Sequence, residues 1–218
     1  MRGGANKNAL PDGLELEIVY NDHFRGVYTD DFKLDHDNLD SVKQESEDIL
    51  SKLTAFVEKT GTLDGVPITV NTNIDNTSYE KLIHGIKEEY DVCNGKIDKG
   101  KLLTYFIDNG KKSMAAMLKH NGDIIGICVF YFTHSPAKRR FGNKINNTKL
   151  FIRVDWLCGS KYKGVGSILV NLLKKIKEEF NLVSIHLISY DSAVPFYEKM
   201  GMTYIGDSWA GTKIMELA

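Results

Sequence analysis

The segment 150–180 joins an apolar run, a glycine-rich stretch and an amphipathic run, and this order constrains the fold more than any other feature. "LFIRVDWLC" (150–158) is apolar enough to form a central strand. After "GSKYKGVGS" (159–167), apolar residues recur every four positions from Ile168 to Phe180, which predicts a helix with one buried face. A strand, a glycine loop and a helix in succession indicate a sheet with helices packed on it, in the α/β (α+β) class.

Periodicity elsewhere predicts a mixed sheet flanked by helices. The Asn-Gly turn at 121–122 separates two apolar runs and predicts a hairpin. The remaining predicted strands are 14–20, 66–73, 113–120, 123–134, 183–189, 202–207 and 212–218, and the remaining predicted helices are 37–59, 76–92, 99–108 and 192–201. For the helix over 76–92, Asn76, Thr77 or Ser78 can cap the start.

Charge divides the chain near "GTLDGVP" (61–67). Residues 1–65 carry 14 acidic and 7 basic residues, whereas the whole chain has a net charge of only -1. We therefore expect an acidic N-terminal strand-helix extension, residues 1–65, packed on a basic core, residues 66–218.

Composition excludes several classes of protein. The near-zero net charge argues against general nucleic-acid binding, and the sequence contains neither a signal-peptide h-region nor an apolar run long enough to span a membrane. The 3 cysteines share no metal-ligand spacing and are odd in number, so neither a disulfide framework nor a zinc site is predicted. A cytoplasmic protein in a reducing environment is the expectation.

The glycine loop predicts an anion site, because free N–H groups and the positive end of a helix meet there. Gly159 and Gly164 have P-loop spacing, but Val165 and Gly166 replace the lysine and hydroxyl of that motif. Leu169 stands where a Rossmann fingerprint needs its third glycine. The remaining interpretation is a diphosphate held by backbone amides without a metal.

Two motifs resemble the GNAT superfamily, the GCN5-related N-acetyltransferases. "KYKGVGS" is similar to its Arg/Gln-x-x-Gly-x-Gly/Ala diphosphate loop, and "SAVPFYEKMGM" is similar to its Ala-x-x-(Leu/Phe)-Tyr-x-x-x-Gly-(Phe/Met) helix. The matching residues are Lys161, Gly164, Gly166, Ala193, Phe196, Tyr197, Gly201 and Met202. A second alignment instead matches Tyr162-Lys163-Gly164 to a Tyr-Arg-Gly element. The resemblance covers about residues 66–218 and implies a GNAT-like, mostly antiparallel sheet.

The resemblance implies transfer of an acetyl group from acetyl-CoA to a primary amine, by direct attack in a ternary complex and without a metal. Tyr197 would be the acid that protonates the leaving thiolate. Pantetheine and the thioester would lie against the strand at Trp156, Leu157 and Cys158. The implied remaining cofactor-binding residues are Lys161, Lys163, Gly164, Val165, Gly166, Ser167 and Ser189.

The general base is less sharply defined by the sequence. Asp155 is the candidate, and a structural salt bridge with Arg153 is its alternative. His186 lies in an apolar strand, which favours a hydrogen-bonded core histidine, and Cys158 has no base partner that would make it a nucleophile. The basic stretch Lys138, Arg139 and Arg140 is interpreted as a solvated loop, with a substrate-side or partner contact as the alternative. Ser189 and Tyr190 either contact the cofactor or cap a helix.

The acceptor is expected to be a small polyamine-like amine or a lysine side chain, drawn by carboxylates of the acidic segment. A solubilising role for those carboxylates is the alternative. The alternative function is a non-catalytic acyl-CoA-binding or regulatory module on the same fold. The expected partners are a small-molecule or peptide amine and, as a possible homodimer, a second copy, but neither nucleic acid nor membrane.

Overall fold

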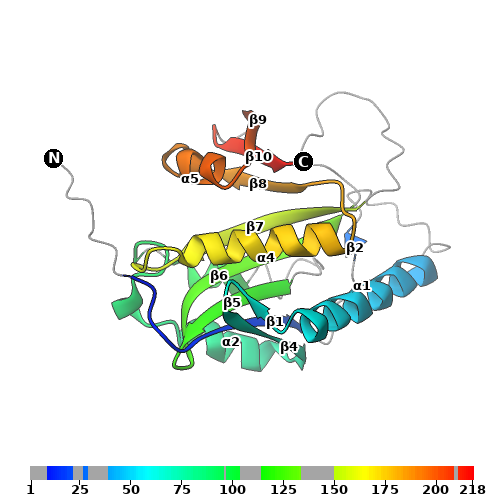
Figure 1. The fold of residues 1–218 in the computed structure, drawn as a ribbon, viewed down its shortest axis with the longest axis horizontal. Coiled ribbons are helices and arrows are strands. Elements are labelled where there is room, and N and C mark those ends of the chain that lie inside the picture. The colour runs from blue at the N-terminus through cyan, green and yellow to red at the C-terminus, as the bar shows by residue number, and fades with distance from the viewer. Residues whose placement is uncertain are drawn as a thin grey trace.

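One large mixed sheet forms the centre of the protein (Figure 1). The computed structural model describes residues 9–21, 27–28, 39–95, 97–103, 114–133, 150–208 and 211–218. The strands are β1 (Leu14–Asn21), β2 (Val27–Tyr28), β3 (Thr62–Leu63), β4 (Val66–Ile74), β5 (Met114–His120), β6 (Asp123–Thr133), β7 (Phe151–Gly159), β8 (Ile185–Ser189), β9 (Thr203–Asp207) and β10 (Lys213–Leu217).

Helices connect and cover these strands. The α-helices are α1 (Leu39–Thr60), α2 (Asn76–His84), α3 (Lys99–Leu103), α4 (Val165–Glu179) and α5 (Val194–Lys199). Two short 3₁₀ turns, η2 (Glu88–Tyr90) and η4 (Asp191–Ala193), complete the described helical elements.

The strand order is β3-β4-β1-β5-β6-β7-β8-β10-β9, with β2 beside β6. Most neighbours are antiparallel; β1–β4, β2–β6 and β7–β8 are parallel. The predicted class, a mixed and mostly antiparallel sheet flanked by helices, is confirmed. The predicted hairpin is also present, since Asn121 and Gly122 both have positive φ, 50° and 83°.

The sheet separates two apolar layers. Buried residues of α1, α4 and α5 pack on one face, which carries Cys128 and Val154. Buried residues of α2 and α3 pack on the other, which carries Val129 and, half-buried, Trp156. Figure 1 shows α4 lying along the first face, and the Lys59 ammonium on α1 contacts the Glu179 carboxylate on α4 at 3.0 Å.

The strand predicted over 14–20 lies inside the sheet. β1 pairs in parallel with β4 and antiparallel with β5, so it separates these two strands. Leu16 and Ile18 on it are fully buried. Tertiary pairing of this kind leaves no trace in local periodicity; the division of the chain at residue 65 stays a prediction.

The helix predicted over 76–92 is shorter in the structure. α2 ends at His84, and the chain continues through η2. Its cap is Asp75, whose Oδ1 accepts from the Ser78 N–H at 2.6 Å, rather than one of the three residues proposed from the sequence. A cap one residue earlier satisfies the same free N–H group.

Gly126 on β6 tests how closely α4 must approach the sheet. A Cβ at this position would overlap Val165 Cγ1 in the first turn of α4. We expect Gly126→Ala to lower the free energy of unfolding by about 2 kcal/mol, as overpacking does, measured by urea denaturation. Gly100→Ala in α3 is the control, because its Cβ would meet only ordinary contacts. Equal stability of the two variants would contradict this packing.

Candidate functional site

Strands β7 and β8 separate halfway along their length. Their parallel ladder comprises Ile152↔Ile185, Arg153↔His186 and Val154↔Leu187, and it ends there. In the described part of the chain, residues 156–159 of β7 keep only β6 as a ladder partner. Figure 1 shows the two strands diverging toward their carboxyl ends, where α4 and α5 begin. The edge of β7 that faces β8 therefore has no neighbouring strand along this stretch.

A β-bulge sits where this divergence starts. Val154 pairs with Phe130 and Trp156 with Val129, so Asp155 is the extra residue on β7. The bulge also reverses the alternation of side chains. Val154 packs on the α4 face, but Trp156 and Cys158, an even number of positions later, pack on the α2 face. The apolar run gave no sign of this irregularity.

Glycines shape the start of α4. Gly164 has φ 102°, a conformation that favours glycine, and it occupies the N-cap position without a side chain that could cap the helix. A Cβ on Gly166 would lie 3.1 Å from Phe196 Cζ. Gly164 therefore allows the turn before α4, and Gly166 allows α4 to approach α5. No side chain at the N-cap position hydrogen-bonds to the first-turn amides of α4.

Tyr197 points from α5 into the core beneath the divergence. It is 7% exposed and packs edge-on against Phe196, with ring centroids 5.0 Å apart. Burial raises the pKa of its phenol, and the neighbouring Cys128 adds to the shift. Burial and then the Asp155 carboxylate raise the pKa of the Cys128 thiol. Cys128 and Tyr197 belong to the same apolar layer, and the Asp155 carboxylate is close enough to affect the Cys128 thiol. Cys128 was not singled out from the sequence.

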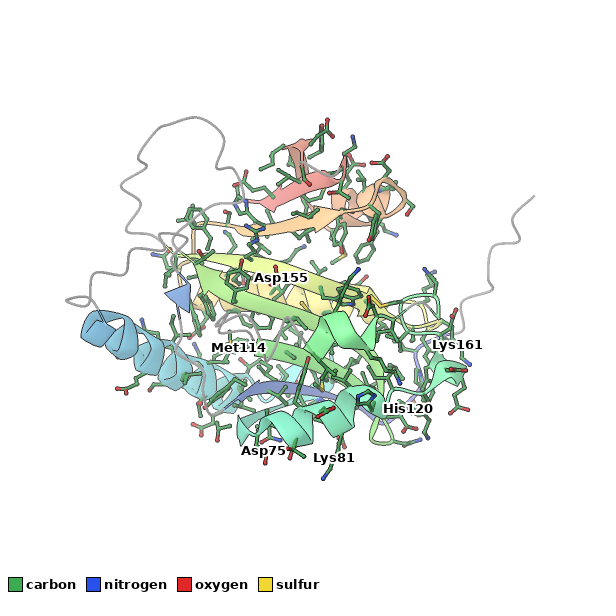
Figure 2. The ribbon with its side chains drawn as sticks, turned by 180° about the vertical axis from the view of Figure 1, so that it is seen from behind. Asp75, Lys81, Met114, His120, Asp155 and Lys161 are labelled. Carbon is green, nitrogen blue, oxygen red and sulfur yellow. A yellow bond between two sulfur atoms is a disulfide. The ribbon has the colours of Figure 1, made fainter. Side chains whose placement is uncertain are left out.

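Lys161 is engaged with the segment around Tyr90, and its ammonium also lies 5.8 Å from the ring centroid of Tyr162. Its backbone N–H donates to the Tyr90 carbonyl at 3.1 Å, and its ammonium donates to the Glu89 carbonyl at 2.6 Å. Figure 2 shows Lys161 at the rim of the molecule and Asp155 deep in the sheet. Lys163 is exposed, so it is the more accessible cation of the loop.

The other cofactor-binding candidates have different surroundings. Val165 is fully buried, Trp156, Leu157 and Ser167 are half-buried, and Ser189 is 2% exposed. The Ser189 hydroxyl donates to the Tyr190 carbonyl at 2.9 Å. The divergence brings the 156–158 edge and the α4 amides to one region.

Cys158 forms a disulfide with Cys93, which corrects the expectation drawn from cysteine number and spacing. Their Cα atoms are 5.0 Å apart and 65 positions separate them in sequence. The Trp156 indole N–H donates to Cys93 Sγ at 3.4 Å. An odd cysteine count could not reveal the pair, because the third, Cys128, is free and buried on the opposite face.

His186 is a buried, hydrogen-bonded histidine, as the sequence indicated. It is 2% exposed, and its Nε2 lies 2.6 Å from Ser184 Oγ and 3.0 Å from Glu216 Oε1. Phe151 packs edge-on against its ring. Such surroundings suit a structural role. The basic stretch 138–140 lies outside the described residues.

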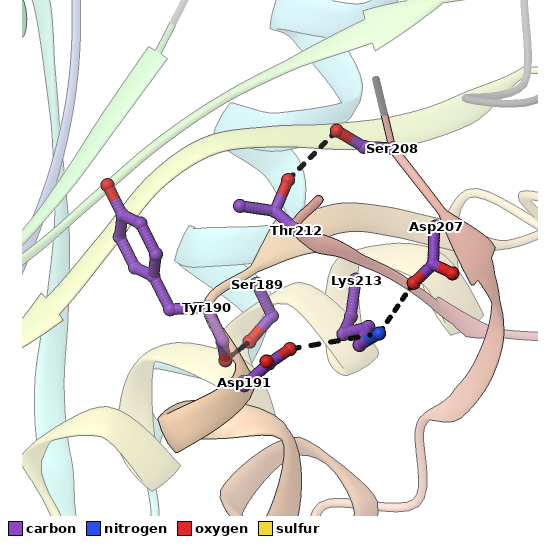
Figure 3. Close-up of polar contacts among 7 residues, drawn as sticks. All are labelled: Ser189, Tyr190, Asp191, Asp207, Ser208, Thr212 and Lys213. Carbon is purple, nitrogen blue, oxygen red and sulfur yellow. Dashed lines mark hydrogen bonds and ion pairs between the residues drawn. The ribbon is translucent and has the colours of Figure 1, made fainter. Parts of the chain in front are cut away.

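A cluster on the β9–β10 hairpin adjoins the end of β8 (Figure 3). The Lys213 ammonium lies 2.6 Å from Asp207 Oδ1 and 3.9 Å from Asp191 Oδ1. Tyr190 is 77% exposed, and its ring extends away from this cluster (Figure 3). The turn after β8 and the β9–β10 hairpin together present exposed acidic and aromatic groups beside the carboxyl end of β8.

A groove of about 530 Å³ flanks the first turn of α4. Gly164, Ser167 and Ile168 line it from α4, and segments 10–14 and 64–67 line it from the other side. Asp12 and Asp64 are the acidic residues of the N-terminal segment in its wall. These carboxylates are thus beside the α4 start, on the side that faces β1 and β4.

Within the described ranges, no group of His, Cys, Asp and Glu is arranged to hold a metal ion. No helix in the same ranges is both long and apolar enough to cross a membrane.

No family model and no curated protein matches the chain. Among solved structures, the Bacillus subtilis N-acetyltransferase YlbP with coenzyme A is 16% identical, with 66% of this chain and 91% of that chain covered and a TM-score of 0.42. The PaiA N-acetyltransferase of Thermoplasma acidophilum with coenzyme A is also 16% identical, covering 66% and 94% at a TM-score of 0.43. The Escherichia coli ribosomal-protein-S18-alanine N-acetyltransferase is 12% identical, with 66% of this chain and 89% of that chain covered and a TM-score of 0.42. All three TM-scores lie below 0.5.

The disulfide should contribute measurably to stability. Closing a loop of this length restricts the unfolded chain by about 4 kcal/mol in the chain-entropy model. Reduction with a phosphine should therefore shift the urea midpoint downward. A Cys93→Ser/Cys158→Ser variant should have the same urea midpoint as the reduced protein, and the reductant should not change that midpoint. An unchanged midpoint on reduction of the parent protein would show that the two sulfurs are not bonded in solution.

Proposed function

We propose that the protein is an acetyl-CoA-dependent N-acetyltransferase that acetylates a primary amine. The observation that carries the proposal is the divergence of β7 and β8 after Val154↔Leu187, with the glycine-capped α4 at its open end and Tyr197 beneath it. An extended pantetheine chain suits such an opening, since it can lie along a strand edge that has no neighbouring strand. The motif resemblance in the sequence points to the same activity.

The diphosphate end of the ligand would lie at the start of α4. Its charge is favoured there by the helix dipole and by first-turn N–H groups of Val165, Gly166 and Ser167. Lys163 is exposed on the same loop and supplies a cation. These residues fit an anion because Gly164 brings no side chain that could compete for the amides. No metal is needed for this binding.

The thioester supplies an activated acetyl group when the co-substrate is bound. Backbone amides of Leu157 and Cys158 would polarise its carbonyl, in the part of β7 that has no ladder with β8. A neutral amine then attacks the carbonyl carbon, the C–N bond forms and the C–S bond breaks. The reaction also needs a group that accepts a proton from the amine and a group that donates a proton to the leaving thiolate.

Tyr197 would protonate the leaving thiolate. Burial and Cys128 raise the pKa of its phenol, so the phenol keeps its proton at neutral pH and can donate it. Asp155 would accept the proton that the acceptor ammonium loses to become the attacking neutral amine, directly or through water. Its place at the bulge, next to the start of the divergence, supports this role.

The acceptor would be a cationic amine, such as a small polyamine-like molecule or a lysine side chain. Exposed carboxylates of Asp191 and Asp207 at the open end of β8 favour a cation, although Lys213 offsets part of their charge. A thiol-release assay with a panel of amines tests the activity. Measurable acetyl-CoA binding without thiol release for any amine would instead favour the alternative, an acyl-CoA-binding module.

Tyr197→Phe should lower kcat about 10²-fold, the lower range for losing a general acid, while the Kd for acetyl-CoA changes little. Steady-state thiol release and calorimetry measure the two quantities. Tyr79→Phe is the control, because Tyr79 is also buried but lies in the layer on the α2 face. Unchanged turnover in Tyr197→Phe would remove this residue from the mechanism.

Asp155→Asn should lower kcat by about 10²-fold through loss of the base. If Asp155 is the base, part of the lost rate should return when the reaction is run at higher pH, where more of the amine is already neutral. A variant that loses activity equally at every pH would point to a structural role. Circular dichroism of both proteins checks that the fold is kept.

A further inference from the structure

The segment 87–95 is fastened to the end of β7 and to the loop that follows. The Cys93 N–H donates to the Gly159 carbonyl at 3.1 Å, next to the disulfide. Lys161, three residues after Cys158, donates from its N–H to the Tyr90 carbonyl and from its ammonium to the Glu89 carbonyl. The disulfide and the Lys161 contacts therefore act on the same two stretches of chain.

The fastened segment has an unfavourable backbone. Cys93 has φ 58°, in the left-handed region that residues with a Cβ seldom adopt, and Asp91 and Asn94, whose residue types tolerate it better, have φ of 53° and 56°. Several such residues in a short stretch persist only where surrounding contacts impose them. Breaking the disulfide removes one of those contacts, so residues 87–95 can move to a more favourable backbone conformation.

Lys161 is the residue that this arrangement withholds from the proposed ligand. It belongs to the glycine loop, but both its N–H and its ammonium donate to segment 87–95. If the segment relaxes, both donors become free within the loop that precedes α4. A lysine ammonium facing a diphosphate forms a strong charge-assisted contact.

We propose that Cys93 and Cys158 are a reversible thiol–disulfide pair that decides whether Lys161 takes part in diphosphate binding. This rests on the proposed function, which assigns the loop to acetyl-CoA. In the oxidised state Lys161 stays bound to segment 87–95 and the protein binds acetyl-CoA more weakly. In the reduced state Lys161 is released and the protein binds acetyl-CoA more tightly.

The redox step needs a dithiol reductant as co-reactant. One of its thiolates attacks a sulfur of the pair, breaks the S–S bond and forms a mixed disulfide. The second thiol then displaces the protein sulfur, so two electrons and two protons pass to Cys93 and Cys158 while the dithiol becomes a disulfide. Both cysteines are half-buried and thus partly reachable, whereas Cys128 is fully buried.

The test compares acetyl-CoA binding by the oxidised and the phosphine-reduced full chain, using calorimetry. We expect roughly tenfold tighter binding after reduction, a factor in keeping with one added charge-assisted contact. Lys161→Met should abolish the difference between the two states, and Lys163→Met should retain it. Equal affinity for acetyl-CoA in both states, or tighter binding by the oxidised chain, would overturn the proposal that the disulfide controls Lys161.

Two further measurements separate this proposal from the proposed function. Alkylation and mass spectrometry should add two more labels to the reduced native chain than to the oxidised one; equal labelling overturns the pair. Amide hydrogen exchange over residues 88–95 should speed up on reduction without any ligand, and unchanged exchange overturns the release of the segment. Failure of either redox state to bind acetyl-CoA overturns the proposed function instead.

Discussion

The end of pairing between β7 and β8 is the constraint on which the rest of the site depends. A half-buried strand edge that has no neighbouring strand is costly unless its N–H and carbonyl groups are satisfied in another way. Here the ladder ends at Val154↔Leu187, and the bulge at Asp155 lies directly beside that point. A fold that keeps such an edge in its interior can use it for a ligand, and α4 and α5 begin where the opening is widest.

The bulge changes which face of the sheet the β7 side chains point to. Before it, Val154 faces α4; after it, Trp156 and Cys158 face α2. Asp155, between them, lies near Cys128 and through it near Tyr197. One extra residue thus places Asp155 at the start of the opening and turns Cys158, with its disulfide to Cys93, toward the α2 face.

Much of the architecture could be predicted from local pattern. The helix over Val165–Glu179, the hairpin at Asn121 and Gly122, and the terminal strands follow from periodicity and turn chemistry. The position of β1 between β4 and β5 did not follow, because strand order is decided by nonlocal pairing. The exact cap of α2 moved to Asp75, since any nearby polar side chain can satisfy the same amide.

By itself the sequence determined the element types, the glycine-capped start of α4 and the placement of Tyr197 on the helix that follows β8, because each depends on residues close together in the chain. Tertiary structure alone decided which donors are free. It engaged Lys161 with Tyr90 and Glu89, buried the Ser189 hydroxyl against a carbonyl, and paired Cys93 with Cys158 across 65 positions. The physical reason is that hydrogen bonds and disulfides depend on distances in space, which local sequence patterns do not encode.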